Sequence, residues 1–150
     1  MKQIFIENML FIERLHRRFL DVIKTELDKL KIDDVNNVQT LILYNINQDR
    51  MTISELTSRG YYLGSNVSYN IKKLVENNYL LQEKSPHDKR AVRIKLSDKG
   101  LALCTKLDAF LGASVAGLND AGVKETDLAE MTKNLRKIER FLTDLISDMY

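Results

Sequence analysis

Apolar residues recur at helical spacing at the start of the chain. Residues 2–30 carry an apolar side chain at every third or fourth position, which predicts a long amphipathic helix. Asp33 or Asp34 then offers an N-cap for a second helix over residues 35–46. The first third of the chain is therefore expected to be helical.

The polar and apolar pattern then breaks twice within a short stretch. Thr52 can begin a short helix that Gly60 ends. Gly64 and Ser65 then form a turn and a cap before a polar helix over residues 66–76. Two short helices joined by a tight turn are the layout of a helix-turn-helix.

A pair of strands is expected after these helices. Asn77 and Asn78 end the polar helix, because Asn tolerates the left-handed backbone conformation. Residues 79–81 begin one strand, and residues 92–96 alternate as a half-buried strand does. Between them lies the polar stretch 85–90, so the pattern predicts a hairpin with a long charged tip.

The last third of the chain returns to helical spacing. Ser97 caps a helix that runs to about Val115. The break after it is expected among three glycines, which are Gly112, Gly117 and Gly122. Apolar residues over 128–149 then alternate at spacings of three and four, which is an a/d heptad seam.

An apolar seam of this length needs a partner. The partner is either the first helix of the same chain or that of a second copy, and the apolar N-terminus suits both arrangements. We therefore expect a homodimer. The residues expected at its interface are Ile4, Phe5, Met9, Leu135, Ile138, Phe141, Leu142, Leu145 and Met149.

Together these elements predict a mainly helical fold of the α+β winged-helix class, with six helices and a two- to three-stranded wing. Dimerisation helices are expected at residues 1–34 and 116–150. A winged helix-turn-helix DNA-binding domain is expected at residues 35–100, with a connecting helix at residues 101–115.

Composition places the chain among ordinary globular proteins, with 29% charged and 44% hydrophobic residues. No uninterrupted apolar run approaches the roughly 20 residues of a membrane span. Cys104 is the single cysteine, which excludes an intramolecular disulfide and fits a reducing compartment. We expect a cytoplasmic protein, associated with the nucleoid when bound to DNA. A buried structural thiol and an oxidant sensor both remain open for Cys104.

Basic charge is concentrated where the helix-turn-helix is expected. Residues 61–100 carry eight basic and four acidic side chains, although the whole chain has a net charge of only +2. Residues 101–150 carry six basic and eight acidic ones. This distribution is typical of a phosphate-binding face, and an ordinary solvated surface is the alternative.

The polar side of the helix over residues 66–76 suits contacts with DNA bases. Asn can pair with adenine, Ser can meet several base edges, and Lys can reach guanine or phosphate. A solvated helix face is the alternative. The residues expected in the major groove are Ser65, Asn66, Ser68, Tyr69, Asn70, Lys72 and Lys73.

The tip of the hairpin is also basic. Arg is the residue that a narrow minor groove attracts most, and a carboxylate such as Asp88 can hold the guanidinium of Arg90 in place. An ordinary charged turn is the alternative. The residues expected at the wing contact are Lys84, His87, Asp88, Lys89, Arg90 and Arg93.

Residues 35–100 resemble the winged-helix core of the MarR family of bacterial transcription regulators. The resemblance is strongest over residues 86–100, which are similar to the family's Asp-x-Arg wing signature, second wing strand and Leu-Ser/Thr-x-x-Gly helix start. By this likeness Arg90 enters the minor groove and Asp88 orients it. The outer helices resemble the family's dimerisation domain.

Three positions depart from the family pattern. Asn78 stands where the family usually has a glycine before the first wing strand. Tyr69 and Glu83 stand near positions where the family often has a basic residue. These two replacements concern the operator sequence and the affinity for phosphate rather than the fold.

The resemblance further implies a homodimer on a pseudo-palindromic promoter site, acting as a repressor that competes with RNA polymerase; activation is equally compatible. It also implies a pocket for a small aromatic or phenolic acid between the DNA-binding and dimerisation parts. The polar residues expected there are Arg14, Arg17, Arg18, Thr40 and Tyr44, and surface ion pairs are the alternative for the arginines. A winged helix used as a protein-interaction module is the alternative function.

An enzyme is not expected. The chain has two histidines, and His16 with Glu13 forms only an isolated pair at helical spacing, whereas a metal site needs more convergent ligands. No glycine-rich phosphate loop and no nucleophile motif appear in the sequence. We therefore assign no catalytic residue, no metal and no cofactor.

Overall fold

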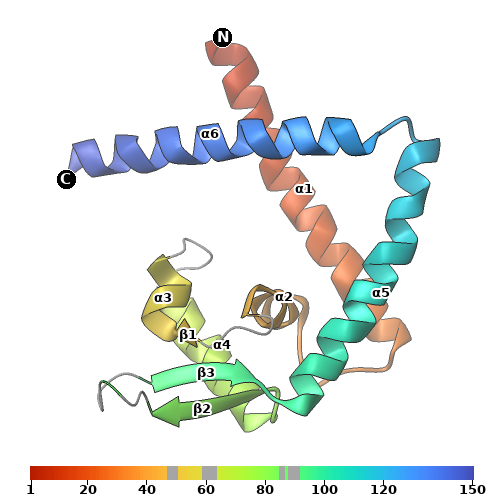
Figure 1. Ribbon diagram of the computed structural model, residues 1–150, viewed down its shortest axis with the longest axis vertical. Helices are drawn as coiled ribbons and strands as arrows, with labels where there is room; N and C mark the ends of the chain where they lie inside the picture. Colours follow the sequence, from red (N-terminus) through yellow and green to blue (C-terminus); the bar gives the residue numbers. More distant parts are fainter. Residues whose placement is uncertain (47–50, 59–63, 85–86, 88–91) are drawn as a thin grey trace. The chain divides into compact units, whose positions relative to one another are not determined.

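The computed structural model describes residues 1–46, 51–58, 64–84, His87 and residues 92–150 (Figure 1). In chain order the elements are α1 (Lys2–Lys29), α2 (Asn37–Ile46), β1 (Met51–Thr52), α3 (Ile53–Ser58), α4 (Gly64–Glu76), β2 (Leu80–Lys84), β3 (Val92–Leu96), α5 (Asp98–Asp120) and α6 (Glu125–Met149). Over these residues the fold has six helices and one three-stranded antiparallel sheet, which confirms the predicted fold class.

Helix α2 is capped by Asn36, so the prediction of a cap at Asp33 or Asp34 was wrong. The Asn36 Oδ1 accepts a hydrogen bond from the backbone N–H of Gln39 (2.8 Å), and Gln39 Oε1 accepts one from the backbone N–H of Asn36 (3.1 Å). This reciprocal pair is a capping box. Asp34 is unsuited to the role because its carboxylate bonds two side chains from later in the chain.

The predicted hairpin is confirmed, and a short third strand joins it. The strand order is β1-β3-β2, so β3 is the central strand. Ile94 of β3 lies opposite Met51 of β1 on one side and Gln82 of β2 on the other. Ile94 is fully buried and Met51 is 1% exposed, so the sheet covers the core with one face.

One hydrophobic core joins α2, α3, α4 and the sheet. Each of these elements contributes side chains that are at most 1% exposed. Burial of one such side chain stabilises the fold by roughly 1.5–3 kcal/mol. The residues are Ile42, Leu43, Ile46, Met51, Leu56, Val67, Ile71, Leu74, Leu80 and Ile94. Helix α4 is therefore fixed by its inner side, and its outer side remains available.

The start of α3 follows the prediction, whereas the start of α4 does not. The Thr52 Oγ1 accepts the backbone N–H of Glu55 (3.0 Å), which confirms Thr52 as the cap of α3. Helix α4 begins at Gly64, so Gly64 and Ser65 belong to its first turn rather than to a preceding turn and cap. The backbone N–H groups of the first turn of a helix have no partner within the helix, so a helix can begin at Gly64 without bonds from these groups to its own carbonyls. Gly60 lies outside the described residues.

Ser97 caps α5, as predicted, through a hydrogen bond that its Oγ accepts from the backbone N–H of Gly100 (3.1 Å). Gly100 also lets this helix approach the start of β2 closely. A Cβ at Gly100 would lie 2.4 Å from the carbonyl oxygen of Tyr79, so no other residue fits there without a shift of the backbone.

Helix α5 runs five residues past the predicted end at Val115 and ends at Asp120. Gly112 and Gly117 lie inside the helix, because a single glycine costs about 1 kcal/mol relative to alanine and does not by itself end a helix. The break comes at Gly122, which has a φ of +82°. Of the three predicted break residues, only Gly122 takes that role.

The chain divides into two compact units, Met1–Asp108 and Ala109–Tyr150, with the boundary inside α5. In the second unit, α6 begins after Lys124, whose backbone N–H donates to the Asp127 carboxylate (2.9 Å). No residue of α6 is buried. The division into dimerisation and DNA-binding parts remains a prediction.

The apolar seams of α1 and α6 are not buried within the single chain. Of the residues predicted at the dimer interface, the exposed ones are Ile4, Leu135, Phe141, Leu145 and Met149. The half-buried ones are Phe5, Met9, Ile138 and Leu142. The homodimer therefore remains a prediction that these exposures are consistent with.

By length and composition alone, α5 is apolar enough to cross a membrane. Part of the helix, however, is buried in the fold, including Leu103, Cys104 and Leu107. A core helix passes the same test of length and composition, so this feature is weak evidence for a membrane span.

Candidate nucleic-acid interface

The outer side of α4 presents polar side chains above the buried core. Val67, Ile71 and Leu74 point into the core and are at most 1% exposed. The exposed residues of the predicted major-groove set are Asn66, Ser68, Tyr69 and Lys72. Amide, hydroxyl and ammonium groups therefore lie together on one side of a rigidly held helix.

Two residues of this set are only half-buried rather than exposed as predicted. Asn70 lies beside α2, where its Oδ1 accepts a hydrogen bond from Gln39 Nε2 (3.2 Å). Lys73 lies 3.5 Å from the Glu76 carboxylate and 5.9 Å from the ring centroid of Tyr69. The side chain of Ser65 is not among those that the structure describes.

The end of α4 is closed by a left-handed residue, as the sequence predicted. Asn78 has a φ of +64°. The backbone N–H of Tyr79 then donates to the carbonyl of Leu74 (2.9 Å), and that of Asn78 donates to the carbonyl of Val75 (3.0 Å). This pair of bonds is a Schellman motif, in which Asn replaces the usual glycine. Asn78 therefore adopts the left-handed conformation that a glycine would supply at this position.

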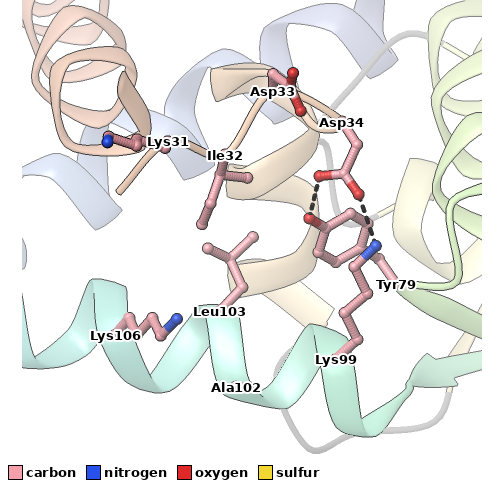
Figure 2. A pocket seen from close by; sticks show the side chains of 9 residues that line it. All are labelled: Lys31, Ile32, Asp33, Asp34, Tyr79, Lys99, Ala102, Leu103 and Lys106. Carbon is pink, nitrogen blue, oxygen red and sulfur yellow. Dashed lines mark hydrogen bonds and ion pairs between the residues drawn. The ribbon is translucent and has the colours of Figure 1, made fainter. Parts of the chain in front are cut away.

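A hydrogen-bonded cluster ties this end of α4 to the loop before α2 and to α5 (Figure 2). The Asp34 carboxylate accepts bonds from Tyr79 Oη (2.5 Å) and Lys99 Nζ (2.6 Å). Lys99 also donates to the carbonyl of Asn77 (2.9 Å), which follows the last residue of α4. Sequence reasoning missed this cluster, because its members are far apart in the chain and none is unusual in its own segment.

The cluster shifts two pKa values. Burial acts to raise the pKa of Asp34, but the bonds from Lys99 and Tyr79 outweigh it and hold that pKa below its ordinary value. Burial, together with the bond to Asp34, raises the pKa of Tyr79. At neutral pH the cluster is therefore an ionised carboxylate held by a neutral phenol and a lysine.

The wing residues are described in part. Lys84 at the end of β2 and His87 are exposed, and Arg93 on β3 is half-buried opposite Glu83. Lys95 is bonded to the Glu83 carboxylate at 2.8 Å, so its charge is partly neutralised. The remaining predicted wing residues, which are Asp88, Lys89 and Arg90, lie outside the described residues.

Comparisons with known proteins agree with this geometry. Residues 35–100 match the family described as "Winged helix DNA-binding domain". The exopolysaccharide II synthesis transcriptional activator ExpG of Rhizobium meliloti is 39% identical over 127 residues, which are 85% of this chain and 66% of that protein. A MarR protein from Peptoclostridium difficile has a similar fold, with a TM-score of 0.76, 17% identity, and coverage of 95% of this chain and 91% of that one.

The chain carries a winged-helix region over residues 35–100, and its fold is that of the MarR protein. Streptococcus pneumoniae FabT, solved in complex with DNA, shares the fold with a TM-score of 0.72 at 21% identity, covering 94% of this chain and 99% of that one. The chain spans 66% of the length of ExpG. ExpG is named as a transcriptional activator, and SarZ of Staphylococcus aureus, which is 25% identical over 117 residues, as an HTH-type transcriptional regulator.

The residues predicted for a ligand pocket have other contacts in this chain. Thr40 is fully buried, and its hydroxyl donates to the carbonyl of Asn36 (2.8 Å). Tyr44 Oη donates to the Asp108 carboxylate (2.7 Å), which raises the pKa of Tyr44. Its hydroxyl is therefore engaged, and a ligand would have to compete with Asp108 for it.

The three predicted ligand arginines lie exposed on α1. Arg14 lies over the ring of Phe11, 4.3 Å from the centroid, and Arg17 is 3.8 Å from the Glu13 carboxylate. The surface ion pair that was the alternative for the arginines is thus present for Arg17, whereas Arg14 contacts an aromatic ring. Arg18 is exposed as well.

A different pocket, of about 410 Å³, lies between the α1–α2 loop and α5 (Figure 2). It is lined by Lys31, Ile32, Asp33, Asp34, Tyr79, Lys99, Ala102, Leu103 and Lys106. None of these residues belongs to the predicted ligand set. The cluster of Asp34, Tyr79 and Lys99 forms one wall of the pocket.

Cys104 is 7% exposed, and burial raises the pKa of its thiol to about 11. A thiol of this kind is protonated at neutral pH, which favours the structural alternative over the oxidant sensor. Within the described part of the chain, no three His, Cys, Asp or Glu side chains are grouped so that they could hold a metal ion.

Proposed function

We propose that this chain is a transcription regulator that binds duplex DNA as a homodimer. In this proposal α4 lies in the major groove and the β2–β3 hairpin reaches the adjacent minor groove. The observation that carries it is the outer side of α4, where Asn66, Ser68, Tyr69 and Lys72 are exposed on a helix whose other side is fully buried. The match of residues 35–100 to a winged helix DNA-binding domain supports the same role.

Charge supports the proposal independently of side-chain geometry. Residues 61–100, which include α4 and the hairpin, carry eight basic and four acidic side chains. Lys72, Lys84 and His87 are exposed on these elements and can approach phosphates. Phosphate contacts of this kind supply affinity and orientation, while base contacts supply sequence preference.

The exposed apolar residues of α1 and α6 support the proposed dimer. Phe141 is 56% exposed and Leu145 is 45% exposed, although both lie on a helix whose other residues are mostly charged or polar. Exposed apolar stripes of this kind mark surfaces that associate. A two-fold dimer presents two α4 helices and matches a pseudo-palindromic site with half-sites about one helical turn apart.

Regulation then depends on how much of the promoter DNA the dimer occupies. The dimer is cytoplasmic and is associated with the nucleoid when it is bound to DNA. A dimer that covers a promoter competes with RNA polymerase and represses, whereas one bound beside a promoter can activate. A small aromatic or phenolic acid near Arg14, Arg17, Arg18 and Tyr44 is the effector we propose. It acts only if it binds the DNA-free and DNA-bound forms with different affinities.

The test is selection from a randomised pool of duplex DNA at two salt concentrations. We expect enrichment of an inverted repeat and an affinity that falls steeply with salt, because phosphate contacts release counterions. Retention of no sequence at either salt would contradict the proposal and point to a protein-interaction module. The same selection with and without salicylate, a phenolic acid, tests the effector.

A further inference from the structure

Gln39 is a buried polar residue that bonds to two different elements. It lies in the first turn of α2 and is 7% exposed. Its Oε1 accepts the backbone N–H of Asn36 (3.1 Å), and its Nε2 donates to the Oδ1 of Asn70 on α4 (3.2 Å). A capping residue of α2 is therefore connected directly to the helix proposed to contact DNA.

These two bonds fix the orientation of both side-chain amides. A backbone N–H only donates, so the Gln39 amide must turn its oxygen toward Asn36. Its NH₂ group then faces Asn70, and an NH₂ group also only donates, so Asn70 must turn its oxygen toward Gln39. The backbone N–H of Asn36 thus sets the orientation of the Gln39 amide, and the Gln39 amide sets the orientation of the Asn70 amide.

The NH₂ group of Asn70 is what remains for other partners. Among the described residues no acceptor bonds it, and no buried side-chain nitrogen or oxygen there lacks a partner. The Asn70 Nδ2 is therefore open to solvent. Asn70 lies one turn from Asn66 and one turn from Lys73, along the edge of the outer side of α4.

We infer that Asn70 contacts a base only as a hydrogen-bond donor, and that Gln39 is the positioning residue that makes it so. The inference rests on the proposed DNA binding. An Asn that pairs with adenine presents both its oxygen and its NH₂ group to the base, and here the bond from Gln39 turns the oxygen toward α2. A donor instead bonds the major-groove acceptors, which are guanine O6 and N7, thymine O4 and adenine N7, and it finds no acceptor on cytosine, which offers only an amino group there.

The experiment compares the base preferences of variants in the same selection from randomised duplex DNA. Asn70→Ala identifies the position in each half-site that Asn70 contacts, because preference is lost there. In Gln39→Glu, one carboxylate oxygen still accepts the Asn36 N–H and the other requires a donor. The Asn70 amide then turns over and presents its oxygen outward. An outward oxygen bonds only amino groups, so we expect the preference for guanine or thymine over cytosine at that position to invert, by about fivefold or more.

Two further variants separate this role from a merely structural one. Asn70→Asp presents an acceptor outward without any change at Gln39, so it should produce the same inversion and replaces Gln39→Glu if that variant does not fold. Gln39→Met removes the bond and leaves the Asn70 amide free to rotate, so preference at the position should relax rather than invert. A structural role alone predicts weaker binding with an unchanged preference.

The outcomes distinguish this inference from the proposed function. If the wild-type chain retains an operator but Gln39→Glu and Asn70→Asp keep its preference for guanine or thymine over cytosine, the inference is overturned and DNA binding stands. An unchanged profile for Asn70→Ala overturns it as well. If the wild-type chain retains no duplex, the proposed function and the inference fail together.

Discussion

Helices α4 and α6 have the same kind of amphipathic sequence but very different surroundings. The apolar side of α4 is enclosed by its own chain, with Val67, Ile71 and Leu74 at most 1% exposed. The apolar side of α6 is open, with Leu135 at 38% and Leu145 at 45% exposed. Burial of such side chains stabilises a fold by roughly 1.5–3 kcal/mol each. Helix α4 obtains this stabilisation within one chain, and α6 does not.

The difference separates two roles that amphipathic helices can have. A helix whose apolar side is enclosed presents its polar side at a fixed angle, as reading a DNA groove requires. A helix whose apolar side is open is a surface for association. If our proposal is correct, changes on α6 affect assembly and changes around α4 affect recognition, and the two kinds of change can be told apart.

The largest effect is expected from Leu142→Asp on the seam of α6. In a dimer this substitution places an unpaired charge in an apolar interface, which costs several kcal/mol. In the single chain Leu142 is only half-buried, so the helix itself should persist. We expect sedimentation to show monomers with unchanged helical circular dichroism.

Ser147→Asp is the matched control, because it adds the same charge to α6 on the side away from the heptad seam. It should leave the dimer intact. If Leu142→Asp also remains dimeric, the seam of α6 is not the interface, and the contrast between the two helices has another cause.

The next largest effect is expected from Arg90→Ala in the wing. If Arg90 enters a minor groove, its loss should weaken duplex binding by about 1–3 kcal/mol, or roughly 5- to 150-fold. The dimer and the thermal stability should not change. Arg136→Ala removes the same charge from α6 and controls for net charge. Equal binding by the two variants would remove the wing from recognition.

A smaller effect is expected from the cluster that holds the end of α4. Asp34→Ala removes hydrogen bonds from Tyr79 and Lys99, which should lower the free energy of unfolding by about 1–2 kcal/mol. Asp33→Ala removes the neighbouring carboxylate, for which no hydrogen bond is found among the described residues. Urea denaturation should therefore separate the two variants. Equal stabilities would mean that the cluster does not hold the fold.

The pH dependence of this difference has a definite sign. The pKa of Asp34 is lowered by folding, so its contribution to stability is complete well above the ordinary value of 3.8. It is lost as the pH falls below that value and through the lower pKa of the folded chain. The stability gap between wild type and Asp34→Ala should thus be constant near neutral pH and narrow in acid.

How far the sequence predicts this fold depends on the range of the interactions involved. The helices, the hairpin and the left-handed Asn78 followed from spacing and from residue conformation within a few positions. The cap of α2 did not, because Asp34 and Asn36 are both good capping residues and only the distant Lys99 and Tyr79 engage the first. Local patterns decide which elements form, and long-range contacts decide between equivalent residues.

The same limit applies to the candidate site. The sequence correctly placed Asn66, Ser68, Tyr69 and Lys72 on an exposed helix side. It also predicted Asn70 as exposed, because helical spacing cannot show that Gln39, 31 positions earlier, lies beside it. The hydrogen bond between them decides what Asn70 can offer to a base, and only the packing of α2 against α4 produces it.

Cys104 tests the contrast within one helix by chemical modification, without any change in assembly or DNA binding. The first part of α5 is buried in the fold and its second part is exposed, so a thiol should behave differently in the two places. Burial raises the pKa of Cys104 from 9.0 to about 11, which leaves about 100-fold less thiolate at neutral pH. We expect iodoacetamide to modify native Cys104 at least 100-fold more slowly than the urea-unfolded chain.

In a Cys104→Ala background, Val115→Cys places a thiol where the native side chain is 53% exposed, and this thiol should react at nearly the unfolded rate. Rapid modification of native Cys104, with loss of DNA binding after mild oxidation, would instead make it a sensor and would mean that this part of the core opens readily.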